Sequence, residues 1–305
     1  MLDTAQPLEA LVEDTRSLAA AGFDAAWCSQ IFAYDALTLL ALLGREVPGI
    51  RLGTFVVPIY PRHPVMLAAQ ALTVQTATEG RLQLGIGLSH QVLIENVFGQ
   101  SFDRPLRYMS EYLEILMPLL HGQRAGFQGE VLSGATLGPL EIPETSPPPV
   151  LLAALGSRML ELAGRKADGT ATWMTGPATI ADHIVPKIRA SAEAAGRPAP
   201  RVAVGLPVCA TSDVAAAREH AARRFALYGQ LPSYRAMLDR EQAAGPADVA
   251  IVGDEAEIER SVSRLADAGA TEFVGAPYGS EDERSRTMAC LSALARGSAH
   301  TSGQG

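Results

Sequence analysis

The sequence predicts an α/β protein that folds as a single (β/α)8 barrel of the TIM type. Three observations predict this class. The chain has 305 residues, which suits a barrel of about 250 residues with insertions. Short apolar runs typical of strands alternate with amphipathic stretches of helical period, and this alternation implies a parallel sheet. No linker segment divides the chain into domains.

The strand-like and helix-like segments follow one another in regular order from residue 4. The expected helices cover residues 4–23, 35–47, 63–80, 104–122, 157–168, 177–196, 213–242 and 254–270. The expected strands cover residues 24–30, 51–59, 81–89, 149–155, 169–174, 201–210 and 271–278. Residues suited to helix ends support these limits, such as Gly22 after the first helix and Asp254 at the start of the last one.

Seven strands are expected in this way, whereas a (β/α)8 barrel needs eight. The missing strand should precede the first helix, where only Met1 to Asp3 remain. We therefore expect these residues to be the end of a truncated first strand, and the chain to start late. An open, doubly wound sheet of seven strands is the structural alternative.

The segment 122–149 interrupts the alternation, and we expect an insertion after the fourth helix. Within it GFQGEVLSG resembles a small hairpin, and PETSPPP is expected to be an extended connector, since its prolines exclude a helix. The barrel domain is expected to span residues 1–297. The tail 298–305 is expected to be disordered.

Composition excludes several classes of partner. The net charge of −8 disfavours nucleic acids and anionic membranes, since both select basic surfaces. Cys28, Cys209 and Cys290 lie far apart, so neither a metal site nor a disulfide framework is indicated. No apolar run reaches the ~18 residues of a membrane span, and the N-terminus lacks the pattern of a signal peptide. These features predict a protein of the cytoplasm.

The segment LQLGIGLSH, residues 82–90, reads as a buried strand that ends at a binding site. It begins like the G-x-G-x-x-G fingerprint of dinucleotide-binding proteins but has His90 in place of the third glycine. In a parallel barrel the active site lies at the carboxyl ends of the strands. The candidate residues are therefore those that follow the expected strands: Ser29, Gln30, 58–63, 87–91, 156–158, 175–177 and 276–279.

Three segments resemble the luciferase-like monooxygenase superfamily, and within it the branch that uses the deazaflavin coenzyme F420. The first segment covers residues 53–90 and begins with GTFVVPIYPRHP. The second covers residues 149–177 and begins with PVLLAALGSRML, and the third covers residues 252–273 and begins with VGDEAEIERS. The resemblance extends from about Leu8 to Gly279. It implies a (β/α)8 barrel with an insertion, which binds flavin or deazaflavin at the carboxyl ends of its strands.

The resemblance also implies positions for the cofactor. Gly87, Leu88, Ser89 and His90 resemble the loop whose backbone lies along the ring and the ribityl chain, although the glycines could instead relieve packing in the barrel. Phe55 and Val56 match the position of a non-prolyl cis peptide behind the ring. The phosphate-side positions are Gly156, Ser157 and Arg158 at one helix start, and Thr175 and Gly176 before the next.

Two residues are candidates for catalysis. Members that oxidise alcohols place a histidine where this sequence has Gln30, and an amide cannot take a proton. Gln30 is therefore expected to bind substrate, and alcohol oxidation is in doubt. His90 is the titratable group expected near the ring, as a proton donor or a substrate ligand. A structural role is the alternative reading for His90, and helix capping is favoured for His63.

These features lead to three functional hypotheses. The first is an F420-dependent oxidoreductase that transfers hydride between the cofactor and a small organic substrate, as a reductase of activated C=C or C=N bonds. The second is an FMN-dependent monooxygenase that uses dioxygen and a separate reductase. The third is a barrel without catalysis that binds flavin or a partner protein. A homodimer and a small-molecule substrate are expected.

Overall fold

The computed structural model describes residues 1–30, 32–143 and 145–302, and side chains up to residue 297. The chain divides into two compact units. The N-terminal unit comprises Leu2–Arg16 and Ala25–Ala153, and the C-terminal unit comprises Met1, Ser17–Asp24 and the chain from Ala154 onward. One barrel domain over residues 1–297 stays a prediction.

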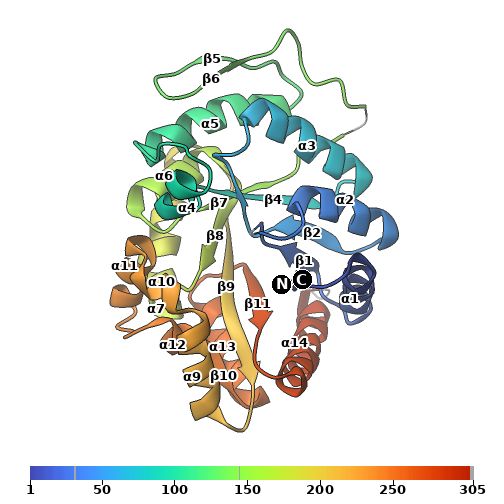
Figure 1. Cartoon of the computed structure of the whole chain (residues 1–305), viewed down its shortest axis with the longest axis vertical. Helices are drawn as coiled ribbons and strands as arrows, with labels where there is room; N and C mark the ends of the chain where they lie inside the picture. Colours follow the sequence, from blue (N-terminus) through green and yellow to red (C-terminus); the bar gives the residue numbers. More distant parts are fainter. Residues whose placement is uncertain (31, 144, 303–305) are drawn as a thin grey trace. The chain divides into compact units, whose positions relative to one another are not determined.

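The N-terminal unit is built on a parallel sheet (Figure 1). Its strands are β1 (Ala25–Cys28), β2 (Arg51–Thr54), β3 (Val57–Pro58), β4 (Leu82–Gly87) and β7 (Val150–Ala153). β1 pairs with β2, β2 with β4, and β4 with both β3 and β7, all parallel. The strand predicted over 51–59 is thus two short strands, because the chain bulges between Thr54 and Val57. Leu84 and Ile86 are fully buried, as predicted for the central strand.

The helices of this unit cover the sheet much as the sequence predicts. They are α1 (Leu8–Ala20), which both units share, α2 (Ala36–Glu46), α3 (Pro64–Ala77), the short α4 (Gln91–Asn96), which the sequence did not indicate, and α5 (Pro105–Leu120). His63 caps α3 by accepting a hydrogen bond from Val65 N at 3.3 Å, which confirms the capping role. The predicted hairpin is also confirmed, as β5 (Gly126–Gln128) pairs antiparallel with β6 (Ser133–Ala135).

The N-terminal residues lie beside the first strand. Leu2 donates its backbone N–H to Trp27 O at 2.8 Å, and its side chain is buried. The contact is the one expected of a strand end next to β1. The truncated strand itself stays a prediction.

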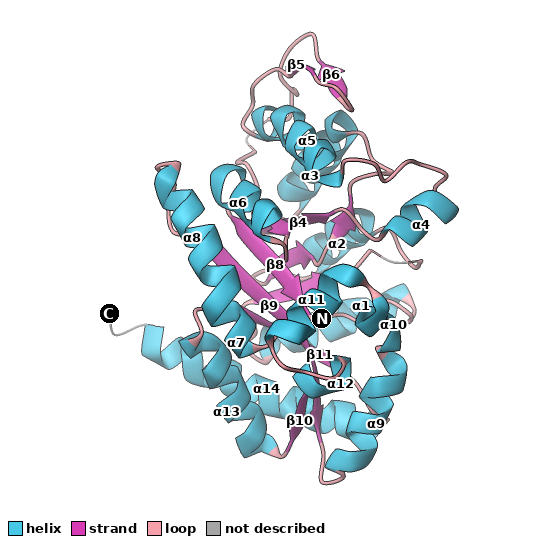
Figure 2. Cartoon of the chain, turned by 90° about the vertical axis from the view of Figure 1, so that its left-hand side faces the viewer, coloured by secondary structure: helices cyan, strands magenta, loops and turns pink. Residues whose placement is uncertain are grey.

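The C-terminal unit holds a second set of parallel strands, with α6 (Ser157–Lys166) and α8 (Val185–Ala194) side by side next to them in Figure 2. The long β9 (Arg201–Ala210) pairs with β8 (Gly169–Trp173), β11 (Glu272–Pro277) and β10 (Ile251–Gly253). β10 was not predicted. It is three residues long and pairs only with the last residues of β9, so no period could reveal it.

The remaining helices of the C-terminal unit lie in predicted helical stretches, except for the two at residues 246–249 and 281–302, which were not predicted. They are α7 (Pro177–Thr179), which a π-helical turn (Ile180–Ile184) joins to α8, then α9 (Val214–Arg224), α10 (Ala226–Gln230), α11 (Pro232–Arg240), α12 (Pro246–Val249), α13 (Glu255–Asp267) and α14 (Glu281–Ser302). A disordered tail is expected over residues 298–305, whereas α14 extends to Ser302. Residues 303–305 lie outside the described part. No described helix is long and apolar enough to cross a membrane.

Candidate functional site

The strand ends of the N-terminal unit hold the bulge that the resemblance assigns to the ring side of the cofactor. The peptide bond between Phe55 and Val56 is cis, as predicted. Ser29 Oγ donates to Phe55 O at 2.8 Å, and Phe55 N donates to Cys28 O at 2.8 Å. These bonds tie the bulge to the end of β1. That the bulge lies behind a ring stays a prediction.

The two glycines of β4 face this bulge. Thr54 Oγ1 donates to Gly85 O at 2.7 Å and accepts from Gly85 N at 2.8 Å. A Cβ at Gly85 would collide with Thr54 O, and a Cβ at Gly87 would lie 2.8 Å from Val56 Cγ2. Both positions therefore need glycine for packing, which is the alternative that the sequence left open. A contact of Gly87 with a cofactor stays a prediction.

Gln30 has a structural role that the sequence did not reveal. Its Oε1 accepts the backbone N–H of Ala36 at 2.7 Å and lies 3.4 Å from Arg62 Nη2, while its Nε2 donates to Tyr34 O at 3.5 Å. Arg62 also forms an ion pair with Asp35, the N-cap of α2. Both ends of the Gln30 amide are thus used to hold the loop before α2, which weakens its prediction as a substrate ligand.

Leu88, Ser89 and His90 form the turn from β4 into α4. All three are half-buried, Ser89 has a left-handed backbone with φ of 62°, and His90 is the N-cap residue of α4. Burial lowers the pKa of His90 below its ordinary value of 6.5. The neutral imidazole therefore predominates at pH 7, so the imidazolium that the sequence interpretation uses as a proton donor forms mainly in acid.

In the C-terminal unit, the start of α6 is open to an anion. Gly156 is the N-cap residue and offers no side chain to the first N–H groups of the helix. A Cβ at Gly156 would meet no atom within 4 Å. Ser157 and Arg158 follow, the former half-buried and the latter exposed. Backbone N–H groups, a hydroxyl and a guanidinium at a helix N-terminus are the donors that a phosphate prefers.

The start of α7 is different, because a carboxylate already lies there. Glu241 accepts the backbone N–H groups of Ala178 at 3.2 Å and Thr179 at 2.8 Å. A Cβ at Gly176 would collide with the same carboxylate, and Thr175 Oγ1 donates to Trp173 O at 3.2 Å. Glu241 thus takes the donors that the sequence interpretation gave to a phosphate. The structure does not support that role for Thr175 and Gly176.

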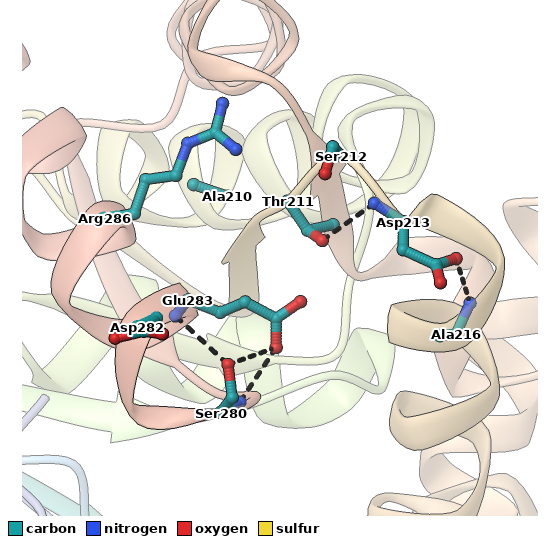
Figure 3. Close-up of a pocket in the computed structure, with 9 residues that line it drawn as sticks. All are labelled: Ala210, Thr211, Ser212, Asp213, Ala216, Ser280, Asp282, Glu283 and Arg286. Carbon is teal, nitrogen blue, oxygen red and sulfur yellow. Dashed lines mark hydrogen bonds between the residues drawn. The ribbon is translucent and has the colours of Figure 1, made fainter.

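The other helices of this unit that come directly after a strand also begin next to a carboxylate. Asp213 accepts from Ala216 N at 3.0 Å in α9, Asp254 accepts from Glu257 N at 2.8 Å in α13, and Glu283 of α14 accepts from Ser280 N at 2.8 Å. Figure 3 shows the first and third of these beside one hollow, with dashed lines at the capping bonds. Among the described helices of the C-terminal unit that follow a strand, α6 alone begins without a carboxylate.

A metal centre finds no support in the described part of the chain, where no three His, Cys, Asp or Glu side chains converge as ligands would. Within each unit, the candidate residues suit an organic ligand. The N-terminal unit presents the bulge at Phe55–Val56 and the turn at residues 87–90, and the C-terminal unit presents the α6 start.

Comparison with known proteins identifies the family. The model of the luciferase-like monooxygenase family matches residues 1–284. The 5,10-methylenetetrahydromethanopterin reductase of Methanolobus tindarius is 27% identical over 238 residues, which are 76% of this chain and 70% of that protein.

Two solved structures share the fold. The coenzyme F420 dependent tetrahydromethanopterin reductase from Methanopyrus kandleri has a TM-score of 0.80 and 21% identity, with 95% of each chain covered. The oxygenating constituent of the 3,6-diketocamphane monooxygenase of Pseudomonas putida, in complex with FMN, has a TM-score of 0.74 and 14% identity, with 95% of this chain and 94% of that chain covered. The predicted barrel fold is thereby confirmed over almost the whole length, and the chain belongs to the luciferase-like monooxygenase family.

Proposed function

We propose that the protein is an oxidoreductase that binds coenzyme F420 and transfers a hydride between C5 of the cofactor and a small organic substrate. The expected direction is the reduction of an activated C=C or C=N bond. A homodimer in the cytoplasm is part of the proposal.

The observation that carries the proposal is the start of α6. A helix N-terminus attracts anions through its unpaired N–H groups and its dipole. Gly156 leaves these groups to a ligand, and Arg158 adds a positive charge in a protein whose net charge is −8. The comparable helix starts of the C-terminal unit carry carboxylates, which would repel a phosphate. The residues therefore fit the phosphate of a flavin-type cofactor.

The choice of F420 over FMN rests on the sequence resemblance and on likeness to the M. kandleri reductase. A bound deazaflavin supplies hydride chemistry at a carbon atom, whereas reduced FMN also reacts with dioxygen. An FMN-dependent monooxygenase supplied by a separate reductase is the second candidate, and the FMN-bound structure from P. putida favours it.

The described residues also bear on the direction of hydride transfer. Oxidation of an alcohol requires a base for the hydroxyl proton, and Gln30 cannot serve, since its amide does not titrate and is used to hold the loop before α2. Reduction requires a proton donor instead. His90 is the proposed donor, and burial lowers its pKa below 6.5, so its imidazolium form is favoured in acidic solution.

The proposal is tested by titrating the purified protein with F420 and, separately, with FMN, while the fluorescence quenching of each cofactor is followed. We expect micromolar or tighter binding of F420 and much weaker binding of FMN. Preference for FMN, together with oxygen consumption once reduced FMN is supplied, would support the monooxygenase instead. Binding of neither cofactor would refute both.

A further inference from the structure

His183 lies in the π-helical turn (Ile180–Ile184) that joins α7 to α8 in the C-terminal unit. The residue is 5% exposed, and its Nε2 lies 2.8 Å from Leu155 O. A carbonyl oxygen only accepts hydrogen bonds, so Nε2 carries the hydrogen of this bond. His183 therefore holds the carbonyl of the residue that precedes Gly156, the N-cap residue of α6.

The backbone around His183 is held on both sides. Ile180 and Ile184 are fully buried, and the turn packs against α6 and α8. Thr179, the residue before the turn, donates its N–H to the carboxylate of Glu241 at 2.8 Å. The carboxylate that lies at the start of α7 thus helps to fix the turn. Turns of π-helix are rare in proteins and occur frequently at functional sites.

The bond to His183 sets the direction of the Gly156 N–H. The peptide bond between Leu155 and Gly156 is trans, and in a trans peptide group the carbonyl oxygen and the amide hydrogen point to opposite sides. Because the oxygen points to the buried imidazole, the N–H of Gly156 points away from it. Gly156 is exposed, and its N–H has no acceptor among the described residues. This donor is therefore available to the anion that is proposed to bind at the start of α6.

We propose that His183 is a positioning residue for the phosphate, because its hydrogen bond to Leu155 O directs the Gly156 N–H towards a phosphate oxygen of the cofactor. The inference rests on the proposed function. Without this donor the Leu155 carbonyl loses its partner in the protein, and the peptide group turns so that the oxygen reaches water. The phosphate then loses one hydrogen bond, while the contacts of the ring remain.

The experiment compares fluorescence titrations with F420 and with the corresponding deazariboflavin, which has the ring and the ribityl chain but no phosphate. His183→Phe keeps a buried ring without the donor and should weaken F420 binding about three- to tenfold. Its affinity for the deazariboflavin should stay that of the wild type. His183→Gln brings an amide N–H to nearly the same place and should restore F420 binding. His183→Leu is the second variant without a donor, to be used if the larger ring prevents folding.

Ser191→Ala is the matched control, because it also removes a side-chain hydrogen bond to the backbone of α6. Ser191 Oγ of α8 donates to Glu161 O at 2.7 Å, beyond the first turn of α6. Ser191→Ala and His183→Phe should each lower the melting temperature of the unliganded protein by about 2–4 °C. Only His183→Phe should change the ratio of the two affinities.

Each outcome decides a different point. If His183→Phe loses affinity for F420 and the deazariboflavin equally, or for neither, His183 serves the fold alone; the inference then fails and the proposed function stands. If Ser191→Ala lowers the affinity for F420 as much as His183→Phe does, general loosening of α6 controls binding, and the inference also fails. A wild type that prefers FMN is tested in the same way with FMN and riboflavin. If the wild type binds neither F420 nor FMN, the proposed function fails and this inference fails with it.

Discussion

Glu111 of α5 holds the inserted hairpin through its carboxylate. The side chain is 5% exposed and accepts three backbone N–H groups of the hairpin turn, from Glu130 at 3.0 Å, Val131 at 2.9 Å and Leu132 at 2.8 Å. Burial alone would raise the pKa of Glu111, but these three donors and the guanidinium of Arg107 together hold it below its ordinary value. We therefore expect Glu111→Gln to loosen the hairpin.

The size of the effect follows from the number of donors. Glutamine keeps one acceptor oxygen and replaces the other with an amide group that donates, so at least one buried N–H loses its acceptor, at about 1–3 kcal/mol. The remaining bonds change from charge-assisted to neutral and lose roughly half their strength. Together these losses predict a decrease of about 2–4 kcal/mol in the free energy of unfolding. Glu130→Gln is the control, since its ion pairs with Arg104 and Arg107 are exposed and should contribute under about 1 kcal/mol.

Urea denaturation measures both variants, and hydrogen exchange of residues 129–132 shows whether the loss is local. The lowered pKa sets a dependence on pH. The stabilisation from Glu111 is present above its ordinary pKa of 4.5 and is lost as the pH falls through the lower value of the folded protein. The gap between wild type and Glu111→Gln should therefore close in acid. Equal stability of Glu111→Gln and Glu130→Gln at pH 7 would refute the reasoning.

Three further predictions concern the candidate site. Arg158→Ala should weaken F420 binding by about 1.5–3 kcal/mol in a fluorescence titration, whereas Arg165→Ala, at the other end of α6, should not; equal affinities would remove Arg158 from the site. His90→Ala should lower turnover of an identified substrate by about 10²–10⁴ while F420 affinity is kept. The wild-type rate should then fall as the pH rises through the lowered pKa of His90, and a flat profile from about pH 5 to 8 would assign the proton to solvent. Gln30→Ala should lower the melting temperature, because Ala36 N loses its acceptor; a change in KM alone would contradict the structural role.

The regular part of the fold was predictable because it follows local periods. The run from Leu82 to Gly87 is apolar apart from Gln83 and is bounded by turn residues, so it could be assigned as a buried strand, and it is one. β10 could not be found in this way, since three residues carry no measurable period and its pairing with the end of β9 is a long-range contact. The short helix α4 was missed for a similar reason.

The site was less predictable, because its chemistry depends on partners far apart in the sequence. Glu241 lies 63 residues from Ala178, whose N–H it accepts, and nothing local to either residue indicates the contact. Gln30 and Arg62 likewise meet across 32 residues. The sequence could predict that another group lies close to the backbone of Gly85 and Gly87. Only the structure shows that this group includes Thr54 O and the side chain of Val56. The sequence therefore indicates where the strands end, but it does not show which hydrogen-bond donors there already have an acceptor within the protein.

The contrast between α6 and its neighbours leads to a prediction that separates stability from binding. Gly156 has φ of −77° and ψ of 148°, a backbone that any residue adopts, and a Cβ there meets no atom within 4 Å. Gly156→Asp should therefore fold and should cap α6 as Asp213 and Asp254 cap their helices, with a gain of a few tenths of a kcal/mol over glycine. The same carboxylate would occupy the N–H groups proposed for the phosphate and repel it, so F420 affinity should fall at least tenfold, by about 1.4 kcal/mol or more. Gly156→Asn caps without the charge and should weaken binding less. If Gly156→Asp is as stable as the wild type and still binds F420 normally, the phosphate does not bind at the start of α6.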